Sequence, residues 1–440
     1  MSVYRLRPLV RWARSRLRVQ RPVSSRVRRI AAVAPPPERL VAITFDDGPT
    51  LGLTEQILEA LERFDARGTF DIIGSTAENY PDAPGRVGGP LWSGLAYDHY
   101  AAFGRDGEAG LRAQPHLVPR IAAAGHELSN HSYRHLAFGP ERVVYRGRQC
   151  HSGALAALED LRQLHTCCGD LAGRAPRLGR PPHYVDRTLD GWSAYDLYDA
   201  MGYQYLAAAF DLGGWQPSAG GRERTVEAAV APLRRALRAD PGGLSGKVLF
   251  AKDGYNMSLD PVVTWALPAQ LELLAAHGYR VVTVSALLER SAFADLPPGD
   301  ALAGSARRLL TAGVPCTFQD NTLRPDEPLT RGDLAAWLAG PVSPPALLAS
   351  PHPLRGDPSA IAAERAWLNP GHAAAPIERG EFERALDRWE WRSVHHRTAA
   401  AAPTSGGDGG RGTVTRGLAL ARMDEALGRR AGPEWIRAAV

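Results

Sequence analysis

Apolar stretches and segments with helical apolar spacing alternate along the chain up to about residue 290. Short apolar runs rich in β-branched residues predict buried strands, and apolar residues spaced three and four apart predict helices. We expect strands at residues 39–45, 68–74, 126–129, 247–251 and 279–284, and helices at residues 54–64, 117–124, 153–165 and 267–277. This alternation is typical of an α/β domain with mostly parallel strands, arranged as a barrel or as an open sheet.

Two segments interrupt the alternation. Residues 75–114 are rich in glycine, aspartate and aromatic residues, and a loop of this length is usually functional or mobile. Its aromatic rings could line a substrate groove or pack into the core, and the sequence does not decide between these roles. The second segment, Gly213–Gly221, is a glycine-rich loop.

After Ser291 the strand signals fade and a repeat follows. Residues 329–338, 377–386 and 414–423 each open with an apolar residue, any residue and then Arg-Gly, with helical apolar spacing behind. Repeats that recur every few tens of residues are typical of structural units that stack around a shared core, although Arg-Gly pairs also recur by chance. We expect three parts: a basic arm and linker (1–37), an α/β barrel (38–291, with 75–114 as an insertion) and helical repeats (292–440, in copies of about 293–340, 341–390 and 391–428).

Charge is distributed unevenly. The net charge of the 440 residues is +5, but residues 1–30 hold ten arginines and no acidic residue, so the remainder is net negative. This weighs against nucleic acid as a partner, because a nucleic-acid-binding body would carry a basic face. No apolar stretch reaches the ~18 residues of a membrane helix, so we expect no transmembrane span.

The basic arm has no continuous apolar stretch, so it does not resemble a secretory signal. A disordered tail, a misassigned start codon and a segment lying on an anionic membrane surface stay open as alternatives. Four cysteines without a Cys-x-x-Cys pair favour free thiols over a Cys150–Cys167 bridge, which stays open as the alternative. Only Lys247 and Lys252 are lysines; all other basic residues are arginines, which we attribute to coding bias.

Two motifs carry candidate chemistry. Asp46 and Asp47 follow an expected strand directly, at the end where α/β folds place their active sites, although Asp-Gly-Pro is also ordinary turn chemistry. His131 and His135 lie four residues apart and form the only His-x-x-x-His pair in the chain. A carboxylate and two imidazoles with an open position for water would make a catalytic site for a first-row metal.

These motifs resemble a known family. From about Arg39 to Glu289 the chain resembles polysaccharide deacetylases of the NodB-homology type, carbohydrate esterase family 4. Thr-Phe-Asp-Asp-Gly-Pro, His-Ser-x-x-His, Arg-Pro-Pro and an aromatic-bearing loop occur in the family's order. The resemblance implies a distorted (β/α) barrel that removes acetyl groups from N-acetylated sugars with a divalent metal, most often zinc, with cobalt or another first-row metal as alternatives.

The resemblance also implies roles for single residues. Asp47, His131 and His135 would hold the metal, and Asp46 would be the general base. Arg180 would orient Asp46 through a charge-assisted hydrogen bond. Asp211 would belong to the catalytic set, and the expected substrate-binding residues are His183, Tyr184 and Trp215.

The chain departs from the family pattern at three places, and the last two concern the general acid. His183 and Tyr184 follow Arg-Pro-Pro where the family has an aromatic residue and then glycine, and Gly214 stands where an aspartate precedes Trp215. Lys252 stands at the position of the family's proton-donating histidine, where its usual pKa near 10.4 suits neutral pH poorly. His183 is a second candidate acid.

Three functional hypotheses follow. The first is an active metal-dependent deacetylase of peptidoglycan or another N-acetylglucosamine polymer, and the second is a catalytically degenerate carbohydrate-binding protein on the same fold. The third is a different metal-dependent C–N hydrolysis. The C-terminal repeats resemble S-layer homology repeats, which implies binding of a cell-wall polymer near the Thr-Arg-Gly arginines. Such binding predicts a location in the cell envelope or outside the cell. Because the sequence shows no recognisable signal peptide, a cytoplasmic location stays open as the alternative.

Overall fold

The computed structural model describes residues 27–75, 109–140, 150–215, 220–255 and 260–290, then 293–339 with short gaps, 374–394 and 412–430. Most of the expected basic arm, most of the insertion at 75–114 and large parts of the second and third repeats lie outside these residues. No helix among the described residues has the length and apolar character needed to cross a bilayer.

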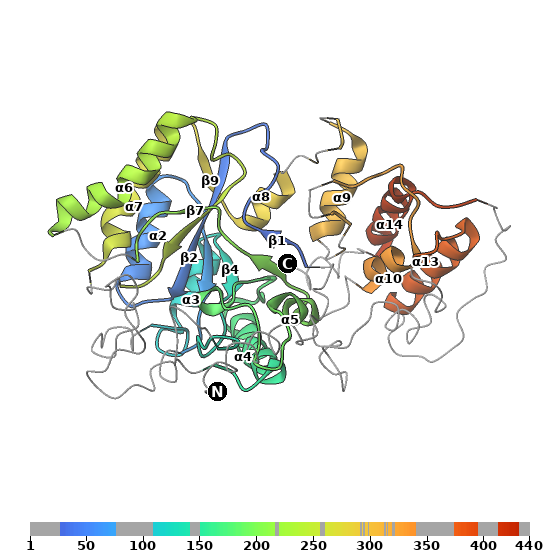
Figure 1. The fold of residues 1–440 in the computed structure, drawn as a ribbon, viewed down its shortest axis with the longest axis horizontal. Coiled ribbons are helices and arrows are strands. Elements are labelled where there is room, and N and C mark those ends of the chain that lie inside the picture. Colours follow the sequence, from blue (N-terminus) through green and yellow to red (C-terminus); the bar gives the residue numbers. More distant parts are fainter. Residues whose placement is uncertain are drawn as a thin grey trace, which may run out of the picture.

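A curled parallel sheet forms the centre of the barrel (Figure 1). Its strands follow the order β1-β6-β5-β4-β3-β2-β8-β7, and β9 also pairs with β2. Their bounds are β1 Arg29–Ile30, β2 Leu40–Gly48, β3 Thr69–Ile72, β4 Glu127–Asn130, β5 Leu178–Gly179, β6 Gln204–Leu206, β7 Phe210–Asp211, β8 Val248–Lys252 and β9 Arg280–Val282. All these pairings are parallel, as the alternating pattern predicts, and the sheet curls into a half-barrel (Figure 1), which confirms the distorted (β/α) barrel that the resemblance implies.

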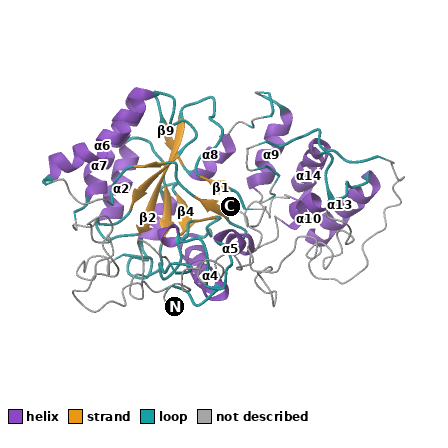
Figure 2. Cartoon of the chain, in the orientation of Figure 1, coloured by secondary structure: helices purple, strands orange, loops and turns teal. Residues whose placement is uncertain are grey.

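Helices cover the outside of this sheet (Figure 2). They are α2 Leu53–Arg63, α3 Leu117–Ala123, α4 Ala154–Ala172, α5 Ala194–Met201, α6 Arg222–Ala239, α7 Val262–Ala276 and α8 Val284–Arg290. The main core lies between strands and helices, where Phe45 of β2, Phe70 of β3 and Leu267 of α7 are fully buried. Stacking of Phe45 on Phe70, with ring centroids 5.0 Å apart, ties β2 to β3.

The structure differs from the sequence expectation at the N-terminal boundary. We expected residues 1–37 to be an arm and linker, but β1 pairs with β6 inside the barrel sheet. Ile30 is fully buried, and Val27 and Val33 are nearly so. The backbone N–H of Arg28 also donates to the Gln204 side chain at 2.6 Å. Residues 27–33 are therefore part of the barrel, since apolar side chains pack there although arginines surround them.

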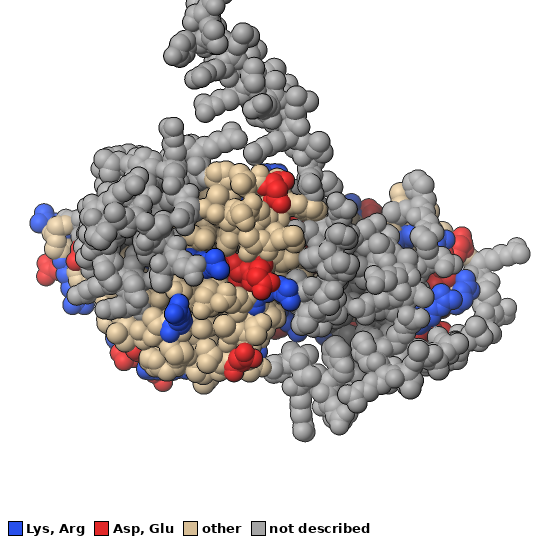
Figure 3. All heavy atoms as spheres, turned by 90° about the horizontal axis from the view of Figure 1, so that it is seen from below, with Lys and Arg blue, Asp and Glu red and all other residues tan. Residues whose placement is uncertain are grey.

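The last strand expected from the sequence is shorter than predicted. We expected residues 279–284, but β9 ends at Val282 and α8 begins at Val284. The four cysteines are free, as expected. On the face drawn in Figure 3, basic and acidic side chains are interspersed over the described residues.

The repeats form a second helical body, with helices α9 Ala301–Thr311, α10 Arg331–Ala339, α13 Arg379–Val394 and α14 Arg416–Arg430. Three of these helices begin at the three repeat arginines. The residues just before them are linked in a ring: the N–H of Leu329 donates to Val414, that of Val414 to Ile377, and that of Ile377 back to Leu329, at 2.7, 3.1 and 2.9 Å. Equivalent positions thus make equivalent contacts, so the recurrence of Arg-Gly is structural and not accidental.

Candidate functional site

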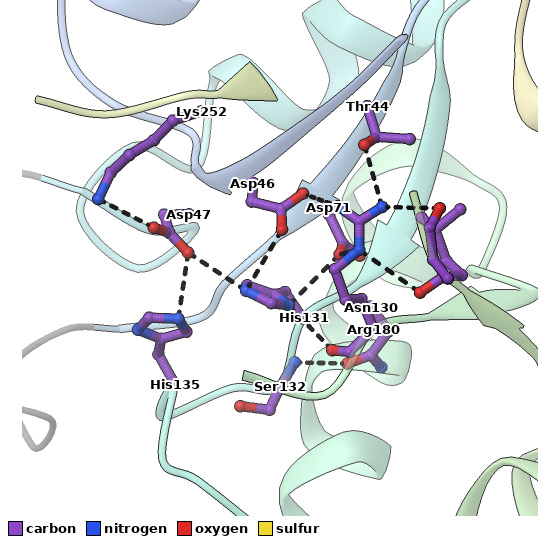
Figure 4. Close-up of polar contacts among 12 residues, drawn as sticks. Thr44, Asp46, Asp47, Asp71, Asn130, His131, Ser132, His135, Arg180 and Lys252 are labelled. Carbon is purple, nitrogen blue, oxygen red and sulfur yellow. Dashed lines mark hydrogen bonds and ion pairs between the residues drawn. The ribbon is translucent and has the colours of Figure 1, made fainter. Parts of the chain in front are cut away.

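The sequence motifs meet at the carboxyl ends of the parallel strands (Figure 4). β2 supplies Asp46 and Asp47, β8 supplies Lys252, and the segment after β4 supplies His131 and His135. In register, Asp46 is level with Lys252 on β8. Arg180 follows β5 and points to the same end. Residues far apart in the chain therefore form one site at the edge where parallel-strand folds place their chemistry.

Three side chains converge on a single point. Asp47 Oδ1 lies 3.2 Å from His131 Nε2 and 3.1 Å from His135 Nε2. The three ligand atoms all lie within 4.8 Å of one another. A tetrahedral zinc ion with bonds of about 2.0–2.1 Å has ligands about 3.3 Å apart, so this spacing and this oxygen–nitrogen donor set fit a catalytic metal with an open position.

The backbone around this point is strained. Five of the seven non-glycine residues with positive φ in the described chain belong to the site: Asp47, Ser132, His135, His183 and Tyr184. Such conformations cost on the order of 1–3 kcal/mol each and gather at functional sites. Neighbouring hydrogen bonds hold the histidine loop in place, because Asn130 Oδ1 accepts from Ser132 N–H at 2.9 Å.

Asp46 is held beside the cluster of Asp47, His131 and His135 by an arginine. The buried guanidinium of Arg180 donates to Asp46 Oδ1 through Nη1 and to the Thr44 hydroxyl through Nη2 at 3.1 Å. Burial raises the pKa of Asp46 to about 7, although Arg180 acts in the opposite direction. Asp46 Oδ2 faces His131 Nε2 at 3.8 Å, so the carboxylate lies next to the metal point.

Lys252 faces the other oxygen of Asp47. Its Nζ lies 3.1 Å from Asp47 Oδ2, and its side chain is only 2% exposed. Burial alone would raise the pKa of Asp47, but Lys252 and His135 lower it well below its usual range. The Asp47 carboxylate is thus shared, with Oδ1 toward the two histidines and Oδ2 toward the lysine (Figure 4).

The expected substrate-binding residues lie in two places. His183 belongs to the 3₁₀ turn Pro182–Tyr184, and its ring centroid is 4.8 Å from that of His135, so it borders the metal point. Tyr184 is 44% exposed, and Arg180 lies 5.6 Å from the centre of its ring. Tyr184 therefore offers an aromatic surface at the rim.

Asp211 and Trp215 form a small loop of their own. Asp211 Oδ2 accepts from Trp215 Nε1 and Oδ1 accepts from Gly213 N–H, both at 2.7 Å. The hydrogen bonds recorded for Asp211 thus stay inside its own loop. The acidic residue that would precede Trp215 in the family pattern is replaced by Gly214, where an added Cβ would lie 3.3 Å from Val263.

Two buried carboxylates at the site were missed by the sequence analysis. Asp71 of β3 lies 3.3 Å from His131 Nδ1. Asp160 of α4 accepts the backbone N–H groups of Tyr133 and Arg134 at 2.7 and 3.2 Å, which holds the loop between the two histidines. An aspartate within the apolar run 68–74 was a signal for Asp71, since a charge in a buried strand requires an explanation.

Comparison with known proteins gives a consistent match. Residues 34–190 match the family described as polysaccharide deacetylase. A peptidoglycan-N-acetylglucosamine deacetylase of Bacillus cereus is 28% identical over 143 residues, which cover 32% of this chain and 36% of that protein. The peptidoglycan-N-acetylmuramic acid deacetylase PdaC of Bacillus subtilis is 22% identical over 254 residues, covering 58% of this chain and 40% of that protein.

A further Bacillus cereus protein, also named peptidoglycan-N-acetylglucosamine deacetylase, is 25% identical over 253 residues, covering 57% of this chain and 89% of that protein. The chain thus spans well under half the length of the first two relatives and most of the third. The residues matched to the family include Asp46, Asp47, His131, His135 and Arg180. This part of the barrel is therefore similar to polysaccharide deacetylase domains.

Proposed function

We propose that the barrel is a metal-dependent hydrolase that removes N-acetyl groups from a polysaccharide such as peptidoglycan or another N-acetylglucosamine polymer. The observation that carries the proposal is the convergence of Asp47, His131 and His135 beside an Asp46 carboxylate that Arg180 holds in place. The names of the relatives, which are deacetylases of cell-wall sugars, point to the same substrate class.

Asp47, His131 and His135 would hold the metal, and zinc fits their donor set best. Such an ion polarises an amide carbonyl and lowers the pKa of a water molecule toward neutrality. Asp46 would accept the proton of the attacking water, since its Oδ2 lies 3.8 Å from Nε2 of the proposed ligand His131 and Arg180 holds its other oxygen. Arg180 fixes the direction of the Asp46 carboxylate throughout.

Lys252 is the proposed proton donor to the leaving amine. Its ammonium faces Asp47 Oδ2, whereas the two histidines face Oδ1, so it lies next to the proposed metal site without being one of the ligands. His183, next to His135, is the second candidate for this role. General acid catalysis typically contributes about 10²–10⁴-fold, so Lys252→Met should slow acetate release by that order if Lys252 is the donor.

The test is acetate release from N-acetylglucosamine oligomers and from peptidoglycan, with Zn²⁺ or Co²⁺ added. Wild type should release acetate, and the isosteric Asp46→Asn variant should not. Equal release by the two proteins would contradict the proposal.

A second candidate function is carbohydrate binding without catalysis. The observations that favour it are Lys252 at the family's acid position and Gly214 in place of an acidic residue. It predicts retention of the protein on N-acetylated glycan without acetate release. If wild type proves silent, restored release by Lys252→His would assign the silence to the missing acid.

We also propose that the repeats bind an anionic cell-wall polymer, which would place the protein in the cell envelope or outside the cell. The three repeat arginines differ: Arg331 pairs with Glu381, and Arg416 is buried and pairs with Asp333 at 3.0 Å. Arg379 is exposed. The acidic partners Glu381 and Asp333 each lie two residues after a repeat arginine, and the residue at the same place after Arg416 is the uncharged Leu418. Arg379 is therefore the arginine best placed for an outside anion.

The matched pair of variants is Arg379→Met and Arg331→Met. If the repeats anchor the protein, Arg379→Met should reduce cosedimentation with purified cell walls more than Arg331→Met does. Equal retention of both variants and wild type would exclude Arg379 as the binding arginine.

A further inference from the structure

Asp71 is a buried carboxylate that the proposed reaction does not use. It lies on β3, level with Asp46 on β2 and with Ser129 on β4. Its side chain is fully buried, and apart from the Ser129 hydroxyl neither oxygen has a hydrogen-bonding group of good geometry within the described chain. Burying a carboxylate without such bonds is costly, so its position demands a compensating partner.

Two of the groups that face Asp71 are positively charged or able to become so. Asp71 Oδ2 lies 3.3 Å from His131 Nδ1 and 3.8 Å from Arg180 Nε. The His131 ring therefore stands between two carboxylates, with Nε2 toward Asp47 and Nδ1 toward Asp71 (Figure 4). Asp71 reaches the metal point through His131 and does not reach it directly.

The tautomer of His131 follows from this arrangement. Its Nδ1 also lies 2.9 Å from the backbone carbonyl of Arg180, which accepts a hydrogen bond. A hydrogen on Nδ1 is therefore favoured by the carbonyl and by the Asp71 carboxylate together, which leaves the lone pair of Nε2 facing Asp47. An imidazole that binds a metal through one nitrogen usually donates the other N–H to a carboxylate or a carbonyl, and this partner strengthens the ligand.

We propose that Asp71 is a positioning residue of the metal site, which fixes the orientation and tautomer of His131 and offsets the positive charge that the ring gains when a metal binds. This inference rests on the metal site of the proposed function. Because the Arg180 carbonyl alone can hold the ring, the fold does not require Asp71. The contribution of Asp71 should therefore appear in metal affinity and not in the stability of the metal-free protein.

Two substitutions test this. Asp71→Asn keeps the shape and removes the charge, and Asp71→Leu removes the buried polar group altogether. The matched control is Glu127→Gln, a carboxylate at the opposite end of the same strand pair that accepts from the Thr69 hydroxyl at 2.9 Å and from Ser285 N–H at 3.1 Å.

The measurement is calorimetric titration of the full chain with Zn²⁺ and with Co²⁺, together with the absorption spectrum of the Co²⁺ form and the melting temperature of the metal-free form. We expect Asp71→Asn and Asp71→Leu to bind both metals about 10–100-fold more weakly, with an altered Co²⁺ spectrum. Their metal-free melting temperatures should equal or exceed that of wild type. Glu127→Gln should bind metal as wild type does and melt at a lower temperature.

Wild-type affinity and an unchanged Co²⁺ spectrum in both Asp71 variants would overturn the inference and leave the metal site standing. An equal loss of metal affinity in the Asp71 variants and in Glu127→Gln would also overturn the inference, since the loss would then follow from removing any buried carboxylate of these strands. Absence of metal binding in wild type would instead overturn the proposed function, and this inference with it.

Discussion

The barrel and the repeats both concentrate charged residues, but they arrange them differently. In the repeats, Arg331 faces Glu381 and Arg416 faces Asp333, so each of these two arginines is matched by one acid of another copy. In the barrel, one oxygen of Asp47 faces two histidines at nearly equal distances. Paired charges hold helices together, whereas ligand atoms converging on one point create a place for a further ion.

Backbone strain separates the two regions in the same way. In the described chain, the barrel site holds five non-glycine residues with positive φ, and the repeats hold one, Arg324. Arg416 instead lies over the rings of Phe318 and Trp337, at 4.4 and 5.0 Å from their centres, in a well-packed position. The barrel site is shaped for chemistry at a cost in backbone energy, and the repeat junction is shaped for stability.

The largest effect should come from removing a metal ligand. We expect His135→Ala to abolish metal binding and acetate release, because the loss of a direct ligand exceeds the roughly 10–100-fold cost of losing an outer partner. Asp46→Asn should abolish release while binding metal, since Asp46 lies beside the ligand set. Metal analysis of both purified variants checks this, and full metal content in His135→Ala would remove His135 from the ligand set.

Breaking a repeat pair should affect stability and leave catalysis intact. Arg416 donates to the carbonyls of Leu323 and Cys316 as well as pairing with Asp333, and it is 2% exposed. The Asp333 side chain is 32% exposed, so Arg416→Met should cost less than the about 3–5 kcal/mol of a fully buried pair but should still unfold the repeats at lower denaturant concentration. The control is Arg379→Met, because Arg379 is an exposed arginine at the equivalent position of another repeat. A large loss of acetate release in Arg416→Met would show that the regions are not separable.

A pH-dependent test probes the barrel away from its site. Burial lowers the pKa of His126 to about 4, and its Nδ1 accepts the Gly68 N–H at 3.0 Å. The folded state therefore takes up fewer protons than the unfolded state, so this stabilisation is complete above pH 6.5 and is lost as pH falls toward 4, by up to about 3 kcal/mol. Denaturant melts of wild type and His126→Gln between pH 7 and 4 should converge accordingly. A constant difference would contradict the assignment.

The smallest effect concerns the loop that carries the histidines. Asp160→Asn keeps one acceptor for the Tyr133 and Arg134 N–H groups but loses the charge, which is worth about 1–2 kcal/mol. We expect slightly weaker Zn²⁺ binding and a lower melting temperature. Glu159→Gln, at the preceding residue of α4, is the control and should change neither. Unchanged Zn²⁺ affinity would mean that the loop holds its shape without Asp160.

The sequence predicted the residues whose chemistry stands out from their surroundings. Adjacent carboxylates after an apolar run and a single His-x-x-x-His pair were enough to place Asp47, His131 and His135 together. Asp71 escaped notice because one aspartate in an apolar run reads as a strand residue until its neighbours across the sheet are known. Register, and not local pattern, puts it beside Asp46 and Ser129.

The fold was predictable where apolar spacing was strong and not where tertiary pairing decides the conformation. Helix α6 was missed because arginines and Pro232 interrupt its apolar spacing, yet Leu233 and Leu237 are fully buried. Strand β1 is two residues long, and its extended conformation is defined by its pairing with β6. Short parallel strands of this kind leave no clear periodic signal.

The central claim is that the Asp47, His131 and His135 cluster is a catalytic metal site. The most direct measurement is stepwise addition of Zn²⁺ to metal-depleted protein, with acetate release from an N-acetylglucosamine oligomer recorded at each step. Release should rise in proportion to added metal and level off at one ion per chain. Release that is already maximal before any metal is added, or that never exceeds that of Asp46→Asn at any metal concentration, would contradict the claim.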